Sequence, residues 1–179
     1  MTGPLAGIRV IDFGQYIAGP LAAMLLADHG ADVIRVDPPG GPRWQTPANA
    51  TWNRGKRSIG VNLKSDAGKA LFREMAAKAD VVIEGMRAGI LDRLGLGFEE
   101  LKALNPAIVF CSVSGLGRYG PYAEMGSHGP SFDAFGALSS INPYALTKEE
   151  RVKSAATPVG MHAMGLYAAV GTLSALVRA

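Results

Sequence analysis

The chain has 179 residues, of which 48% are hydrophobic and 18% charged, a composition typical of a folded globular protein and not of a disordered one. Its net charge of +3 is small and scattered, which argues against a nucleic-acid-binding protein. We find no signal peptide before the first predicted strand, and a single cysteine, Cys111, cannot form an internal disulfide. We therefore expect a cytoplasmic protein in which Cys111 is a buried small hydrophobe rather than a nucleophile.

The first forty residues predict a strand, a glycine-bearing turn, a helix and a second strand. The apolar run Val10-Ile11 stops at Gly14, and a new alternation begins only at residues 33–36. Pro20 suits the first turn of a helix, and Gly30 suits the position just past a helix end. Such a unit can bind a phosphate-sized anion at the helix N-terminus, where backbone N–H groups point outward.

The turn from Gly14 to Gly19 is not one of the common nucleotide-binding loops. It lacks the G-x-G-x-x-G spacing, and Pro20 stands where the dinucleotide fingerprint needs a glycine for close packing. A P-loop would place Lys-Ser or Lys-Thr after the second glycine, and neither follows Gly19. An ordinary nicotinamide- or flavin-dependent oxidoreductase is therefore disfavoured.

The rest of the chain continues the alternation of strands and helices. We predict a long loop at 40–53, a strand at 58–63, a helix from the cap Ser65 to about Ala79, a strand at 81–83 and short helices at 89–94 and 98–104. After these we predict a strand at 108–113, a flexible glycine-rich loop at 116–130, a helix at 132–139 capped by Ser131, a polar connection at 141–158 and an apolar helix at 159–177. The last helix is long enough to span a membrane, but we expect a core helix instead. The pattern predicts an α/β fold with a mainly parallel sheet and a ligand site beyond the carboxyl ends of its strands.

Several short blocks follow one another in an order that identifies a family. They are Ile11-Asp12-Phe13, Ala18-Gly19-Pro20, Leu25 to Val36, Asn53 to Ile59, Ala79 to Glu84, Leu91 to Gly95, Leu104-Asn105-Pro106, Ser112 to Gly115 and Gly165 to Gly171. In this order the blocks resemble the class III CoA-transferases, which include formyl-CoA transferase, carnitine CoA-transferase and the 2-methylacyl-CoA racemases. The resemblance covers nearly the whole chain.

The resemblance implies a Rossmann-like parallel sheet, with residues 1–179 as the N-terminal part of the family's large domain. The small domain and the C-terminal return of the chain would then be absent, so that a fragment, a truncated form and one component of a split assembly are all open. Family members form interlocked dimers, and we expect a homo- or hetero-oligomer in which another chain covers the last helix. The family implies coenzyme A or acyl-CoA and a carboxylic acid as partners, with no metal, nucleic acid or membrane.

The family's chemistry is transfer of CoA between carboxylic acids through an aspartate nucleophile. Its carboxylate attacks an acyl-CoA thioester, and CoA thiolate then opens the mixed anhydride to an enzyme-bound thioester. The resemblance places this aspartate at Met161, which cannot form an anhydride, and no carboxylate lies between Arg151 and the chain end. His162 is read as a helix residue rather than a replacement nucleophile.

A second acidic position of the family corresponds to Asp133, which is our candidate catalytic residue. The alternative is that Asp133 is an early-helix charge stabilised by the helix dipole. Racemases of the family carry a histidine just before this acid, where the present chain has Phe132, so racemization is disfavoured. His128 lies too far along the preceding loop for us to expect it to replace that histidine.

The resemblance also implies a CoA site. Its residues would be Tyr16, Ile17, Ala18, Val61, Asn62, Leu63, Lys64, Gly85, Met86 and Arg93. Arg93 suits a phosphate because a guanidinium donates two parallel hydrogen bonds, although it could instead pair with Asp92 or Glu99 on a helix surface. A basic cluster of Arg54, Lys56, Arg57 and Lys64 could meet a polyphosphate or form a solvated face. The chain departs from the family at Ile17, where a glutamine is common, and at Pro38, where a basic residue is common.

Two function classes remain after this comparison. The chain is either part of a CoA-transferase whose nucleophile comes from a partner chain or whose chemistry has shifted, or a non-catalytic CoA-binding or scaffolding subunit of a heteromeric transferase. A plain Rossmann oxidoreductase is a distant third.

Overall fold

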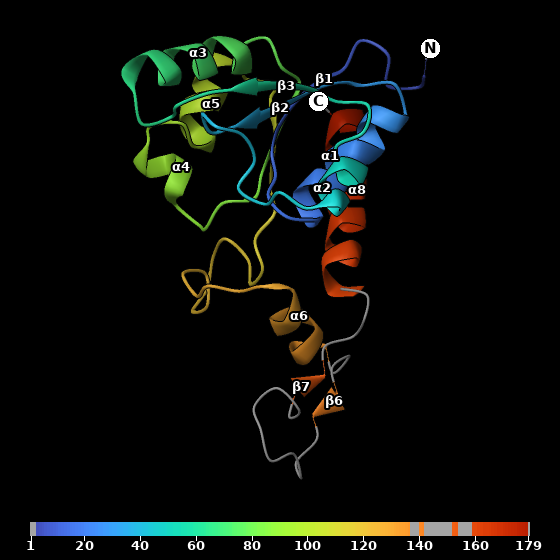
Figure 1. Cartoon of the computed structure of the whole chain (residues 1–179). Coiled ribbons are helices and arrows are strands. Elements are labelled where there is room, and N and C mark those ends of the chain that lie inside the picture. Colours follow the sequence, from blue (N-terminus) through green and yellow to red (C-terminus); the bar gives the residue numbers. More distant parts are fainter. Residues whose placement is uncertain (1–2, 137–139, 142–151, 154–158, 179) are drawn as a thin grey trace.

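The computed structural model describes residues 3–136, 140–141, 152–153 and 159–178. Its centre is a five-stranded sheet in the order β3-β2-β1-β4-β5, and every neighbouring pair is parallel (Figure 1). The strands are β1 (Arg9–Phe13), β2 (Asp32–Asp37), β3 (Arg57–Gly60), β4 (Val81–Glu84) and β5 (Val109–Ser112). This architecture confirms the predicted α/β fold with a parallel, Rossmann-like sheet.

Helices cover both faces of the sheet. On one side lie α1 (Ala18–Asp28) and α8 (Val159–Arg178), and on the other lie α3 (Asp66–Ala76), α4 (Ile90–Arg93) and α5 (Phe98–Leu104) (Figure 1). Because side chains alternate along a strand, Val10 packs with the α1 and α8 cluster while Ile11 packs with the α3 to α5 cluster. The strands are therefore apolar on both faces, as expected for a parallel sheet covered by helices.

The helix predicted from the cap Ser65 is confirmed at its start. The Ser65 hydroxyl accepts a hydrogen bond from the Gly68 N–H at 3.1 Å, and Asp66 stands in the first turn, where a negative charge is favourable. The helix ends at Ala76, three residues earlier than predicted. Phe72 is its fully buried anchor and meets the Phe13 ring edge-on, with ring centroids 4.8 Å apart.

Some predicted boundaries are wrong. The long loop at 40–53 contains a helix, α2 (Pro47–Trp52), which begins with a proline as helices often do. The strand predicted to reach Leu63 ends at Gly60, and α6 (Gly129–Phe135) begins after His128 rather than at a Ser131 cap.

The predicted connection at 141–158 falls mostly outside the described residues, as does the predicted end of the preceding helix. Within the described part of this region, β6 (Ser140–Ile141) pairs antiparallel with β7 (Val152–Lys153).

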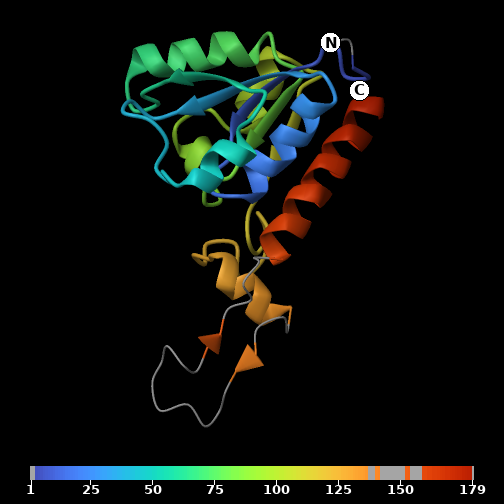
Figure 2. The ribbon, with the colours of Figure 1, turned by 45° about the vertical axis from the view of Figure 1, so that its right-hand side comes forward.

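Helix α8 is packed on one side only. It lies alongside α1 (Figure 2), and this close approach depends on Gly165, where an added Cβ would stand 2.8 Å from the Ala18 carbonyl oxygen. By length and composition α8 is the one described helix that could cross a membrane. Its opposite side exposes apolar residues, including Leu166 and Tyr167, so the prediction of a core helix holds for one face only.

Cys111 on β5 faces this helix. It is only partly buried, in contrast to the prediction, with its Sγ 3.9 Å from the Ala168 carbonyl oxygen. Burial raises the pKa of its thiol, which keeps it protonated and makes a nucleophilic role unfavourable.

Candidate functional site

The turn between β1 and α1 requires its two glycines. A Cβ on Gly14 would stand 2.6 Å from the Gly19 carbonyl carbon, and a Cβ on Gly19 would stand equally close to the Gly14 Cα at 2.6 Å. The spacing Gly14 to Gly19 therefore lets the end of a strand touch the start of a helix. Within this turn Tyr16 has φ of 60°, a left-handed conformation that non-glycine residues rarely adopt and that is concentrated at functional sites.

A buried charge network holds the turn from below. Lys56 Nζ donates to Asp12 Oδ2 at 2.7 Å, to the Pro20 carbonyl oxygen at 2.9 Å and to Asn53 Oδ1 at 3.0 Å. Asp12 Oδ1 in turn accepts the Gly14 N–H at 2.6 Å. The Asp12 and Lys56 side chains are 0% and 1% exposed, and burial lowers the pKa of Lys56 despite the adjacent carboxylate.

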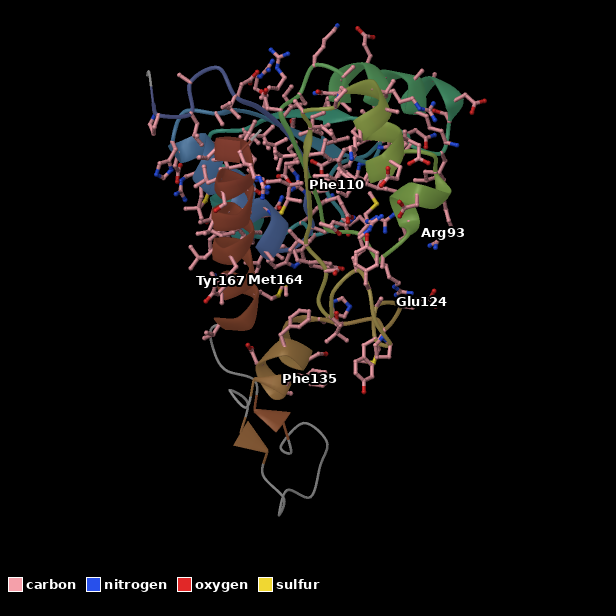
Figure 3. All side chains as sticks on the ribbon, turned by 180° about the vertical axis from the view of Figure 1, so that it is seen from behind. Arg93, Phe110, Glu124, Phe135, Met164 and Tyr167 are labelled. Carbon is pink, nitrogen blue, oxygen red and sulfur yellow. The ribbon has the colours of Figure 1, made fainter. Side chains whose placement is uncertain are left out.

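A first cavity of about 310 Å³ opens beyond the carboxyl ends of β1, β2 and β4. Its apolar wall comes from the strands, the segment after β3 and the loop and helix α4 after β4, and comprises Phe13, Val36, Val61, Leu63, Met86, Ile90 and Leu94. Four cationic residues line it, of which Arg35 is paired with carboxylates while Arg43, Lys64 and Arg93 are not paired with any carboxylate of the described residues. Figure 3 shows Arg93 on α4 at one side of the molecule.

The three cations have no acidic partner among the described residues. The one carboxylate at the cavity, Asp37, is held by Arg35 at 3.0 Å. The alternative that Arg93 pairs with Asp92 or Glu99 is wrong, because no ion pair among the described residues joins Arg93 to either carboxylate, and Asp92 accepts from Arg118 at 2.7 Å. These free positive charges suit an anionic ligand.

The basic cluster predicted as a polyphosphate site is not one site. Arg54 pairs with Asp28, Lys56 is buried against Asp12, and Arg57 makes a bidentate pair with Asp32. Of the four residues only Lys64 lines the cavity. Charges adjacent in the sequence are thus neutralised by carboxylates from other elements.

A second cavity, of about 540 Å³, adjoins the first. Five residues line both cavities: Gln15, Tyr16, Arg43, Met86 and Ile90. The strained turn at Tyr16 therefore lies at the boundary between the two cavities. The wall of the second cavity also includes the glycine-rich loop after β5, Phe132 of α6, and Met161 and Met164 of α8. Met164 lies on α8, far across the molecule from Arg93 in Figure 3.

An aromatic row marks the boundary between the cavities. The Tyr16 ring lies 5.9 Å from the Trp44 ring and 5.6 Å from the His128 ring, measured between centroids. Trp44 lines the first cavity and His128 the second. The structure therefore places His128 at the site, although its position in the loop argued against a role there.

The loop after β5 is attached to the sheet through Glu84. This carboxylate, 3% exposed, accepts from the Ser112 hydroxyl and from the Met86 N–H at 2.8 Å. Arg118 of the loop stands 3.7 Å from it. Burial raises the pKa of Glu84, although its hydrogen bonds and Arg118 oppose that shift.

Most of the residues predicted to bind CoA line these cavities. The first cavity is lined by Tyr16, Val61, Asn62, Leu63, Lys64, Met86 and Arg93, and the second by Tyr16, Ala18, Gly85 and Met86. Ile17 is 8% exposed and lines neither cavity. Sequence reasoning missed Arg43 and Trp44, whose one available signal was their place in a long loop. That the residues predicted from the sequence bind CoA remains a prediction.

The two candidate catalytic positions, Met161 and Asp133, differ in their access to the second cavity. Met161 lines the second cavity, whereas the Asp133 side chain is buried, with its residue 1% exposed, and Oδ1 accepts the Gly160 N–H at 2.9 Å. Asp133 thus ties α6 to the start of α8, and its catalytic role remains a prediction. The His162 ring packs edge-on against the Trp52 ring at 5.0 Å.

Comparisons with known proteins agree with the fold. The chain is 35% identical over 184 residues to the succinyl-CoA–D-citramalate CoA-transferase of Chloroflexus aurantiacus, covering 97% of the chain and 45% of that protein. It is 43% identical over 143 residues to the succinate–glutarate CoA-transferase of Agrobacterium fabrum, covering 70% of the chain and 36% of that protein. A crystal structure of a CAIB/BAIF family protein from Brucella suis superposes with a TM-score of 0.88 at 33% identity, covering 99% of the chain and 50% of that protein.

The chain therefore spans half or less of the length of these relatives. The model of CoA-transferase family III matches residues 5–179, which is nearly the whole chain. This match over nearly the whole chain shows that the protein belongs to CoA-transferase family III.

Proposed function

We propose that this protein takes part in the transfer of CoA between carboxylic acids, with an acyl-CoA thioester as donor and a free acid as acceptor. The observation that carries the proposal is the first cavity, which combines an apolar wall with three cations that have no acidic partner in the described chain. An adenine nucleotide needs both features, because its base is apolar on its faces and its phosphates are anionic. The nucleotide part of CoA would occupy this cavity.

The remainder of the ligand would follow the turn into the second cavity. The pantetheine arm would pass Gln15, Tyr16 and Met86, which line both cavities. The thioester would then lie beside the Tyr16 turn, and the acyl group would lie against Phe132, Met161 and Met164. The described residues that line the second cavity include no Asp or Glu, so an incoming carboxylate meets no like charge from them.

The chemical class of the acids is proposed from the relatives. Their names state transfer to or from citramalate, malate and glutarate, all small organic acids. Two further relatives, from Chloroflexus aurantiacus, are named the beta and alpha subunits of succinyl-CoA–L-malate CoA-transferase. Their names support a homo- or hetero-oligomer for this chain, which we propose is interlocked. We propose a cytoplasmic location, since a single cysteine is typical of proteins that fold without disulfides in a reducing compartment.

We also propose that the 179-residue chain alone does not perform acyl exchange. No carboxylate lies between Arg151 and Ala179, and Met161 lines the cavity at the position assigned to the nucleophile. Asp133, the remaining candidate, has its carboxylate engaged with the Gly160 N–H rather than open to the cavity. A carboxylate from a partner chain would complete the reaction.

Binding is tested by calorimetry with free CoA. Arg93→Ala should weaken the affinity by about 1–3 kcal/mol, the scale of a lost hydrogen bond to a charged group. Arg54→Ala is the matched control, because Arg54 pairs with Asp28 and lines neither cavity. Equal affinities for the two variants would remove Arg93 from the site.

Catalysis is tested by hydroxylamine trapping of an activated carboxyl group in the presence of acyl-CoA. The unmodified chain should yield no trapped product, and Met161→Asp should yield one if the cavity can position that carboxylate. Trapping on the unmodified chain would refute the proposal that it is incompetent alone. Its loss in Asp133→Asn would then identify Asp133 as the nucleophile.

A further inference from the structure

We propose that Arg118 is a positioning residue that fixes the glycine-rich loop 114–128 as a wall of the second cavity and couples that wall to the first cavity. Below, the first cavity is called the CoA cavity and the second the acyl cavity, after the parts of the ligand proposed for them. The proposal rests on the function proposed above for the two cavities. Arg118 itself lines neither cavity, so any effect it has on binding must act through other residues.

The loop has few other attachments. Its backbone hydrogen bonds between described residues are local, as in Ala123 N–H to the Gly120 oxygen at 3.2 Å and Met125 N–H to the Tyr122 oxygen at 3.0 Å. Within the part of the chain that the structure describes, Arg118 makes the side-chain ion pairs that join the loop to the sheet and to α4. The contact of the His128 ring with Tyr16 adds a second attachment at the far end.

Arg118 reaches three elements at once. Its guanidinium donates to Asp92 Oδ1 at 2.7 Å on α4, stands 3.7 Å from Glu84 Oε1 at the end of β4, and lies 5.7 Å from the centre of the Phe110 ring on β5. The Arg118 side chain is only 19% exposed. Asp92 is 42% exposed, so the sheltered pair is that of Arg118 with Glu84, whose side chain is 3% exposed. A sheltered ion pair is stronger than one at the surface.

The short helix α4 connects the two cavities. Asp92 holds the loop through Arg118, and the next residue, Arg93, lines the CoA cavity. The loop itself contributes residues such as Leu116, Met125 and His128 to the acyl cavity. A ligand phosphate that fixes Arg93 would therefore fix α4, and through Asp92 and Arg118 it would also fix the acyl wall.

Hydrogen exchange measured by mass spectrometry tests the role of Arg118 without catalysis. In Arg118→Gln, backbone amides of 114–128 should exchange roughly three- to tenfold faster than in the wild type, as expected for a partly buried ion pair. Arg54→Gln, which breaks an exposed bidentate pair with Asp28, should leave this loop unchanged. Equal exchange of the loop in both variants would overturn the proposal.

The coupling is tested by repeating the measurement with free CoA. Saturating CoA should protect 114–128 in the wild type, in Arg54→Gln and partly in Arg118→Lys, but not in Arg118→Gln. Equal protection by CoA in Arg118→Gln and in the wild type would overturn the coupling. If Arg118 had a merely structural role, CoA would protect the loop equally in both proteins. A wild type that binds no CoA would overturn the coupling together with the proposed function, while the ligand-free comparison would still decide the role of Arg118.

Discussion

Replacing Lys56 by methionine tests the buried charge network under the turn. Lys56 Nζ donates three hydrogen bonds, to Asp12, to the Pro20 carbonyl oxygen and to Asn53. Methionine fills a similar volume but donates none of them. The change therefore leaves the Asp12 carboxylate, which is 0% exposed, without its close cation and with only the Gly14 N–H and the more distant Arg35 beside it.

The expected loss of stability is large. Removing one partner of a buried ion pair costs about 3–5 kcal/mol, because the other charge remains buried without compensation. Arg35 is the nearest remaining cation, 3.6 Å from Asp12, but it is already bonded to Asp37 and Asn53. We therefore expect a value near the lower limit, about 3 kcal/mol, which is a large share of the roughly 5–15 kcal/mol typical of folded domains.

Urea unfolding followed by circular dichroism measures this loss. With a denaturant slope of about 2 kcal/mol/M, the midpoint should fall by about 1.5 M. Arg54→Met is the control, since it breaks an exposed pair with Asp28 and should cost at most about 1 kcal/mol. The double variant of Asp12→Asn with Lys56→Met should regain part of the loss, because the stranded charge is gone.

Two results would refute this reasoning. Lys56→Met could lose no more stability than Arg54→Met, which would mean that the Asp12 carboxylate is compensated by other groups. The double variant could be no more stable than Lys56→Met, which would mean that the loss arises from packing rather than from charge.

Three further changes have expected outcomes. Gly14→Ala should lower stability by about 1–3 kcal/mol and weaken CoA binding, because its Cβ would meet the Gly19 backbone at 2.6 Å. Gly171→Ala is the control, because its Cβ would meet nothing within 4 Å. Equal losses of thermal stability in the two variants would contradict this expectation. Ser65→Ala should cost about 0.5–2 kcal/mol in urea, and no loss would show that the cap bond contributes nothing. Because burial raises the pKa of Glu84 above its usual 4.5, the native state holds the proton longer, so the free energy of unfolding should fall as pH rises from 4.5 through that raised pKa. Glu84→Gln should flatten this fall, and unchanged pH slopes would exclude Glu84 as its source.

Local patterns in the sequence were sufficient for the elements of the fold. Each of the apolar runs around Val10, Val82 and Val109 became a strand of the parallel sheet, because a strand covered by helices on both faces must be apolar throughout. The cap at Ser65 is a bond between residues three apart, so it too is visible in the sequence. The order of short blocks identified the family, which the match over residues 5–179 confirms.

The partners of the charged residues were decided only by the tertiary structure. The sequence presents Arg54, Lys56 and Arg57 as one basic cluster, yet each meets a different carboxylate from an element 25 to 44 residues away. Arg118 likewise meets Glu84 and Asp92 only because β4, α4 and the loop after β5 converge at one edge of the sheet. Charge pairing acts through space over a few ångströms, so it depends on how the strands are ordered, and a linear pattern carries no record of that distance.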